Sequence, residues 1–137
     1  MIRRIVLDTN IYVSALRYGG KPKQVLDYAQ SGNSKLLISA PLMLELVRVL
    51  RDKFGFTASR IAGSIEILWR DAEWIEPARR LDLCPDEPDN RVLECALEGK
   101  TDFIVTGDRH LLNLPLIKEV AILSPDAFLA RLAQSAQ

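Results

Sequence analysis

Two carboxylates come directly after apolar runs of the kind that form buried strands. Asp8 ends the run Arg4-Ile5-Val6-Leu7, and Asp108 follows Phe103-Ile104-Val105 after a Thr-Gly turn. In an open parallel sheet, reacting groups collect in the crevice beyond the carboxyl ends of the strands. The sequence therefore predicts that Asp8 and Asp108 project from the same edge of a sheet.

Three more carboxylates are candidates for this crevice. Glu45 stands in a predicted helix beside apolar neighbours, where a charged carboxylate is costly unless it is paired, so it either pairs with Arg48 or Lys53 or serves the crevice. Asp86 and Asp89 lie in the turn before another predicted helix. Capping of that helix would explain Asp89, and delivery of the turn into the crevice is the functional alternative.

A divalent cation would stabilise such a cluster. Carboxylates forced together repel one another and raise one another's pKa unless a positive charge lies between them. The chain has one His and two Cys. The available ligands are therefore oxygens, which suit Mg²⁺ or Mn²⁺ better than zinc.

The single histidine, His110, lies two residues after Asp108. Imidazole titrates near neutral pH, which makes it a candidate for acid–base chemistry. One histidine cannot supply a paired acid and base. We therefore assign the chemistry to Asp108 and expect His110 to be partly exposed in a helical turn. Cys84 and Cys95 lack a C-x-x-C spacing, and we expect both to be reduced.

The elements that position these groups alternate between strands and helices. Strands are predicted at about 3–8, 36–39, 103–106 and 120–123, with weaker extended segments at 74–76 and 81–83. Helices are predicted soon after 8 and at about 22–30, 40–53, 57–69, 89–98 and from 124. The helix at 40–53 is apolar over most of its circumference and should be largely buried. This alternation predicts a three-layer α/β/α fold with a mostly parallel central sheet of four to five strands.

Composition limits the class of protein. The 137 residues suit one compact core, so we expect a single domain over 1–137. No stretch approaches the roughly 20 consecutive apolar residues of a membrane-spanning helix, and we expect a cytoplasmic protein without membrane contact. Lys plus Arg and Asp plus Glu are both 18, so the net charge is zero, which argues against a protein that simply coats nucleic acid.

Four motifs, in this order, resemble the PIN-domain ribonucleases, in particular the small prokaryotic VapC-like toxins of toxin–antitoxin pairs. They are IVLDTN near the N-terminus, LMLELVRVL after the second predicted strand, DEPDN before a helix, and IVTGDRHLL. The first and last are fairly specific, and the resemblance covers nearly the whole chain. His110 is a departure, because many relatives have a second Asp there.

The resemblance implies an acidic quartet of Asp8, Glu45, Asp89 and Asp108 that holds one or two Mg²⁺ or Mn²⁺ ions. Asp86 matches a less regular acidic position and is a fifth candidate ligand. Water activated by the cations would attack an RNA phosphodiester bond. A cognate antitoxin and a homodimer are the partners that the resemblance implies.

Polar and basic residues complete the expected site. Asn10 and Thr106 match motif positions that orient a ligand carboxylate or the attacking water. Glu94 either stands behind the ligands or lies on a solvated helix face. Basic residues on nearby segments are candidates for contacts with the RNA backbone: Arg17, Lys21, Lys23, Arg48, Arg51, Arg91 and Arg109.

Two other readings of the sequence stay open. A PIN fold can serve as a catalytically silent binding or assembly module, since fold alone does not set function. A receiver-like phosphate-signalling domain is also a parallel α/β fold with acids at strand ends. That class expects adjacent acids near the first strand and a Lys after a late strand, whereas Asp8 has no acidic neighbour and Ser124-Pro125 follows the last predicted strand.

Overall fold

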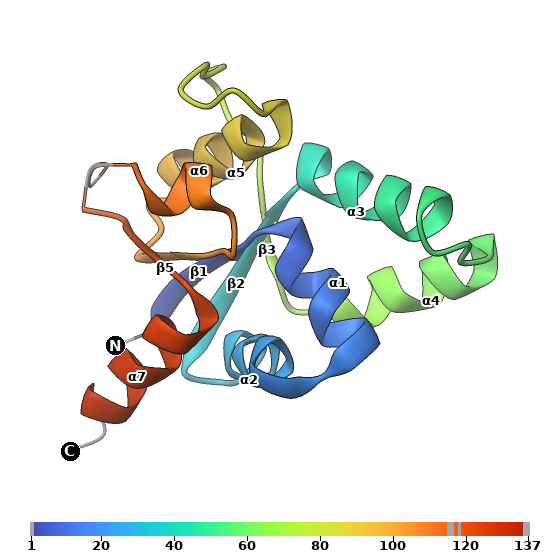
Figure 1. Ribbon diagram of the computed structural model, residues 1–137, viewed down its shortest axis with the longest axis horizontal. Coiled ribbons are helices and arrows are strands. Elements are labelled where there is room, and N and C mark those ends of the chain that lie inside the picture. Colours follow the sequence, from blue (N-terminus) through green and yellow to red (C-terminus); the bar gives the residue numbers. More distant parts are fainter. Residues whose placement is uncertain (1, 115–116, 118, 136–137) are drawn as a thin grey trace.

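A five-stranded sheet forms the centre of the protein in a computed structural model that describes residues 2–114, 117 and 119–135. The strands are β1 Arg3–Leu7, β2 Ser34–Ser39, β3 Glu73–Ile75, β4 Phe103–Val105 and β5 Ala121–Leu123. They lie in the order β3-β2-β1-β4-β5, and all four pairings are parallel. The expected parallel sheet of four to five strands is therefore confirmed, with β1 at its centre (Figure 1).

Seven helices lie in the described residues and cover both faces of this sheet. They are α1 Thr9–Tyr18, α2 Gly20–Ala29, α3 Ala40–Asp52, α4 Ala58–Leu68, α5 Glu87–Glu98, α6 Arg109–Leu112 and α7 Pro125–Ser135. In Figure 1, α5 and α6 lie above the sheet, whereas α2 and α7 lie side by side below it. The three-layer α/β/α architecture is thus confirmed. No described helix is long and apolar enough to cross a membrane.

Helix α3 shows where the hydrophobic pattern overstated burial. Leu42, Leu46, Val49 and Leu50 are buried against the core, but Leu44 keeps 62% of its surface exposed. The expectation of a largely buried helix is correct for one face only. The opposite face is free because α3 lies at the outside of the molecule, with α1, α4, α5 and β2 as its main neighbours.

Gly99 ends α5, as predicted, but for a different reason. Its φ is −80°, so it does not take the left-handed conformation that usually favours glycine at a helix end. Lys100 takes that conformation instead, with φ 50°. A Cβ on Gly99 would lie 2.3 Å from Leu37 Cδ2, so the missing side chain allows α5 to approach β2 closely.

Candidate active site

Asp8 and Asp108 follow two neighbouring strands, β1 and β4, at the same edge of the sheet. The buried hydroxyl of Thr106 links them: its Oγ1 donates to Asp8 Oδ2 at 2.7 Å and accepts from the Asp108 backbone N–H at 3.0 Å. The Asp8 backbone N–H also donates to Val105 O at 3.0 Å. These bonds fix both aspartates on the sheet edge, as their positions in the sequence predict.

Asp108 also starts α6. Its Oδ1 accepts the His110 backbone N–H at 2.7 Å, so one carboxylate oxygen caps this short helix. His110 is exposed, and its role in the described contacts is that of a backbone donor. The expected position in a helical turn is correct, and His110 is more exposed than the partly exposed residue that was expected.

Asp86 and Asp89 come from the N-terminal end of α5. Asp86 occupies the N-cap position, but its side chain makes no capping hydrogen bond. Asp89 stands in the first turn, is only 4% exposed, and its Oδ2 has no hydrogen-bond partner. One ligand atom from each of Asp86, Asp89 and Asp108 lies within 4.8 Å of the others. We call these three residues the acidic cluster.

Burial and repulsion by neighbouring carboxylates raise the pKa values of Asp89 and Asp8. Desolvation is the main cause for Asp89, followed by the charges of Asp108, Asp8 and Asp86, and together they raise its pKa from 3.8 to about 7. The pKa of Asp8 is also raised, first by desolvation. A buried carboxylate oxygen without a partner, next to other carboxylates, needs either a proton or a cation. The all-oxygen donor set fits Mg²⁺ or Mn²⁺.

Glu45 lies beside this cluster without being part of it. Its carboxylate forms an ion pair with Arg48, with Oε1 2.7 Å from Nη2 and Oε2 3.2 Å from Nε. The charge of Glu45 nevertheless contributes to the raised pKa of Asp8. The sequence left pairing and a site role as alternatives, and the structure shows the pairing with a position close to Asp8.

A known protein family matches most of this chain. A family described as PIN domain matches residues 4–110, which is more than half of the chain and reaches from β1 to the start of α6. The chain belongs to the PIN-domain family.

Individual proteins similar to this PIN domain come from three different organisms. "Uncharacterized protein MJ1680" from Methanocaldococcus jannaschii is 30% identical over 117 residues, which cover 81% of this chain and 74% of that protein. Among solved structures, VapBC2 from Rickettsia felis, bound to a DNA fragment from its promoter, has a TM-score of 0.63 at 16% identity and covers 88% of this chain and 98% of that one. The T. brucei RRP44 PIN domain has a TM-score of 0.54 at 14% identity, covering 99% and 84% respectively. At these identities the two structures show a shared fold.

In this PIN domain, side chains from α5 hold the segment before the helix by hydrogen bonds to its backbone. Asn90 is fully buried, and its Oδ1 accepts the backbone N–H groups of Leu83 and Cys84 at 2.9 and 2.8 Å while its Nδ2 donates to Cys84 O at 3.0 Å. The predicted weak extended segment at 81–83 is therefore not a strand, because its backbone groups form hydrogen bonds with α5 side chains and not with a neighbouring strand. Sequence reasoning missed Asn90; the only signal was an amide next to Asp89 at the start of the helix.

Arg91 and Glu94 form further hydrogen bonds to the segment before α5. Glu94 is buried, and its Oε2 accepts the Leu81 N–H at 2.7 Å. Arg91 Nε lies 2.9 Å from Glu94 Oε1, and Arg91 Nη2 donates to Leu81 O at 3.1 Å. Glu94 is thus not on a solvated face, and Arg91 is committed to structure rather than free for a phosphate.

Other polar candidates divide into free and engaged groups. Asn10 in the first turn of α1 and Arg109 at the start of α6 are exposed, and neither side chain has a hydrogen bond or ion pair within the described part of the chain. The remaining basic candidates, apart from Arg17, are paired with carboxylates: Lys21 with Asp126, Lys23 with Asp27, Arg48 with Glu45 and Arg51 with Asp52. Arg17 lies over aromatic rings.

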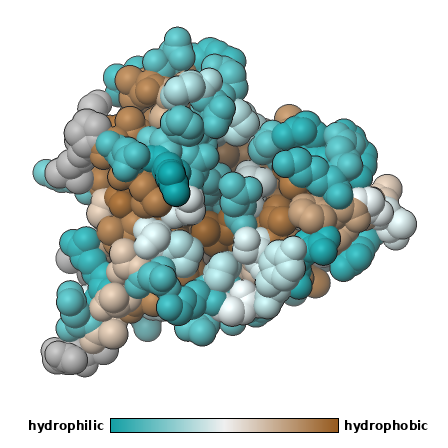
Figure 2. Space-filling model, viewed as in Figure 1, coloured by the Kyte–Doolittle hydropathy of each residue, from teal (hydrophilic) through white to brown (hydrophobic). Residues whose placement is uncertain are grey.

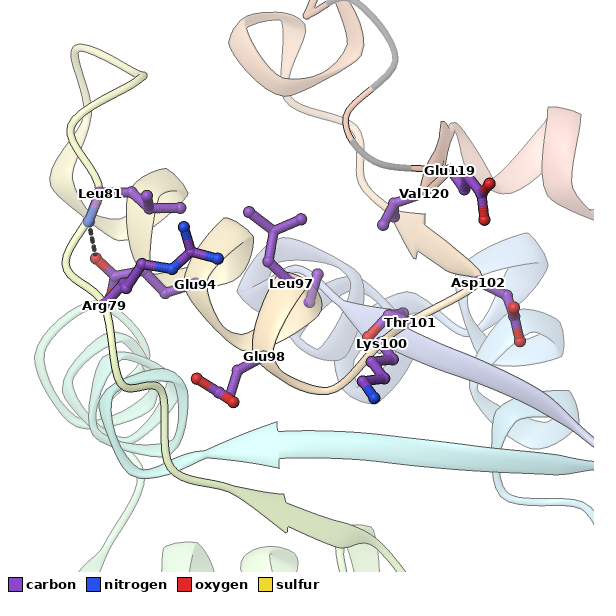
Figure 3. A pocket seen from close by; sticks show the side chains of 11 residues that line it. Arg79, Leu81, Glu94, Leu97, Glu98, Lys100, Thr101, Asp102, Glu119 and Val120 are labelled. Atoms are coloured by element: carbon purple, nitrogen blue, oxygen red, sulfur yellow. Dashed lines mark hydrogen bonds between the residues drawn. The ribbon is translucent and has the colours of Figure 1, made fainter.

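A pocket of about 530 Å³ lies elsewhere, beside the C-terminal half of α5 (Figure 3). Glu94 and Glu98 line it, but both carboxylates already accept backbone N–H groups, those of Leu81 and Ala78. None of the aspartates of the acidic cluster lines this pocket. The pocket is therefore separate from the candidate active site.

Both cysteines are free and buried.

Proposed function

We propose that this PIN domain is a ribonuclease that uses Mg²⁺ or Mn²⁺ to hydrolyse RNA phosphodiester bonds. The observation that carries the proposal is the convergence of Asp86, Asp89 and Asp108 with a buried, unpartnered oxygen on Asp89. Once ionised, such a group is costly to the fold unless a cation binds it. Membership of the PIN-domain family supports the nuclease assignment.

The proposed ligand set is Asp8, Glu45, Asp89 and Asp108, with Asp86 as a fifth member. Bound divalent cations supply a Lewis acid that makes water a nucleophile near neutral pH and neutralises charge on the phosphate. Asp89 is available at once, because its Oδ2 has no partner. Glu45 would join by turning away from Arg48, an exchange that is cheap at a partly exposed pair.

Other side chains would set orientation and charge. Thr106 holds Asp8 by donating its hydroxyl proton to Oδ2, and Asp8 Oδ1 would be the oxygen that binds a cation. Asn10 would orient the attacking water or a ligand, and Arg109 would contact a phosphate at the start of α6. The net charge of zero would rise to +4 with two divalent cations bound, which favours an RNA strand.

We further propose that residues 1–137 form one PIN-like domain and act as the toxin of a toxin–antitoxin pair. The fold likeness to VapBC2 from Rickettsia felis supports this role. A cognate antitoxin and a second copy of the chain would be its protein partners. Co-expression with the neighbouring reading frame, followed by co-purification, tests the pairing; a chain that is harmless when expressed alone counts against the toxin role.

A cleavage assay tests the enzyme proposal. Wild type, Asp8→Asn and Asp89→Asn are compared on mixed RNA with Mg²⁺ or Mn²⁺ and with EDTA, and Asp71→Asn, an exposed aspartate before β3, is the matched control. We expect cleavage by wild type and Asp71→Asn only, and none in EDTA. Equal cleavage by all four proteins would mean contamination, and a clean preparation of wild type without activity would favour a silent binding module. Mapping of RNA ends after controlled expression of wild type and Asp8→Asn would then identify the target.

A further inference from the structure

A group of cations and aromatic rings lies at the far ends of α1 and α3, away from the acidic cluster. We call it the basic aromatic surface, and it consists of Arg17, Tyr18, Lys53, Phe54, Phe56 and Arg60. Phe54 and Phe56 come from the connection between α3 and α4. The guanidinium carbon of Arg17 lies 4.4 Å from the Phe54 ring centroid, and that of Arg60 lies 3.7 Å from the Phe56 ring centroid. Cations from two different helices therefore cover the rings of one loop.

The charge of this surface is not neutralised locally. Within the described residues, Arg17, Lys53 and Arg60 have no carboxylate within ion-pair distance. The adjacent carboxylate of Asp52 is occupied by Arg51, with Nε 2.8 Å from Oδ1. No described carboxylate therefore neutralises the charge of these three cations, which lie on one surface.

Tyr18 adds an open aromatic face. It is 75% exposed, the highest fraction among the large hydrophobic side chains that are exposed. Arg17 lies 5.4 Å from its ring centroid as well as over Phe54. In Figure 2, apolar residues show between the hydrophilic side chains over α3 and the paler ones over α1.

Two helices run from this surface to the sheet edge that carries Asp8 and Asp108. α1 begins directly after Asp8, and Tyr18 lies ten residues further on, about 15 Å along a helix. α3 begins after β2 at the same edge of the sheet, and Phe54 follows soon after its end. The two helices pack against each other, so the surface and the cluster lie at opposite ends of one helix pair (Figure 1).

We propose that the basic aromatic surface binds an unpaired stretch of the RNA substrate, a few nucleotides away from the bond that is cut. Bases stack on Tyr18 and on the arginine-covered rings, and phosphates contact Arg17, Lys53 and Arg60. Stacking on aromatic rings and arginine planes, with cations along the backbone, is how proteins hold single strands without reading their sequence. Three cations without a described carboxylate partner match the phosphates of an RNA strand in charge. This inference rests on the proposed ribonuclease function, which it extends to the form of the substrate.

Binding measured without cleavage tests the inference. Fluorescence anisotropy with a labelled uridine dodecamer in EDTA reports affinity while no metal is present. We expect Tyr18→Ala to bind about 10-fold more weakly, and Arg17→Gln and Arg60→Gln each to reduce the slope of log affinity against log salt by about 0.7. Arg131→Gln is the matched control, because Arg131 is an exposed arginine that lies 5.5 Å from the Phe103 ring centroid. Its affinity should equal that of wild type.

The outcomes separate this inference from the ribonuclease proposal. Wild-type affinity in Tyr18→Ala and Arg17→Gln, or no binding of the dodecamer by wild type, would overturn the inference whether or not RNA is cut. Weaker binding by these variants together with no cleavage in Mn²⁺ would support the surface and refute the nuclease. A changed elution volume of Tyr18→Ala on gel filtration, with RNA binding unaltered, would make the surface a protein interface and also overturn the inference.

Discussion

Asp89→Asn should make the metal-free protein more stable, although it removes a proposed ligand. The pKa of Asp89 is raised from 3.8 to about 7, so the native protein holds this proton more tightly than the unfolded chain. Its contribution to stability is therefore complete below about pH 4 and is lost as the pH rises through 7. Above pH 7 the ionised carboxylate costs about 4 kcal/mol, because each pKa unit corresponds to about 1.4 kcal/mol. Asparagine has nearly the same shape and no charge, and so avoids this cost.

Urea unfolding in EDTA at about pH 5 and about pH 8 measures the effect. Between these values Asp89 alone should lower the wild-type free energy of unfolding by about 2 to 3 kcal/mol, and Asp89→Asn should lack this part of the pH dependence. Asp71→Asn, which changes an exposed aspartate, should follow the wild type. Saturating Mn²⁺ at about pH 8 should then raise the melting temperature of wild type but not that of Asp89→Asn.

Two results would refute this reasoning. If metal-free Asp89→Asn is no more stable than wild type at about pH 8, the carboxylate is not strained by burial and by its neighbours. If Mn²⁺ stabilises both proteins equally, the cation binds without Asp89. Either result would contradict the argument that the buried Asp89 carboxylate binds a cation, on which the proposed metal site depends.

Three further substitutions test the supports of the site. Thr106→Val removes the hydroxyl that links the two strand-end aspartates, and we expect a 10- to 100-fold loss of cleavage rate with little change in fold by circular dichroism. Asn90→Ala removes three hydrogen bonds to Leu83 and Cys84, two of them buried, which should lower the free energy of unfolding by about 2 to 4 kcal/mol and weaken Mn²⁺ binding in calorimetry. Gly99→Ala places a Cβ 2.3 Å from Leu37 Cδ2 and should lower the free energy of unfolding by about 1 to 3 kcal/mol in urea, with the metal affinity unchanged.

Each of these substitutions has a result that would contradict its explanation. Full activity of Thr106→Val would mean that the sheet edge alone fixes the aspartates. Wild-type stability of Asn90→Ala would mean that the backbone of the turn holds itself. A stable Gly99→Ala would show that Leu37 moves aside without cost.

The fold and the strand-end acids were accessible from the sequence because each rests on a local pattern. Buried strands such as Phe103–Val105 are short apolar runs, and carboxylates placed at the ends of neighbouring parallel strands must share an edge. Asp86 and Asp89 were also predictable as a turn before a helix. The sequence did not resolve which of these acids approach one another and which form an ion pair with a basic side chain.

The supports of the site were not predictable, because they depend on side-chain conformations and contacts that no periodic sequence pattern encodes. The Glu45 pairing with Arg48 was one of two open alternatives, and only the conformation of both side chains decides it. Asn90 bonds to backbone groups six and seven residues away, in a segment that has no regular structure of its own. Gly99 was predicted correctly at the end of α5, but a glycine is needed there because Leu37 on β2 lies so close.

The link between Thr106 and Asp8 spans 98 positions of the chain and has a consequence for synthesis on the ribosome. Asp8 is made early, but its hydroxyl partner and Asp108 belong to the last quarter of the sequence, roughly 5 to 20 seconds later at ordinary elongation rates. During that interval the nascent chain has the first strand and no complete site. A protein that cuts RNA would thus remain inert towards the message and ribosome that are making it until β4 docks beside β1.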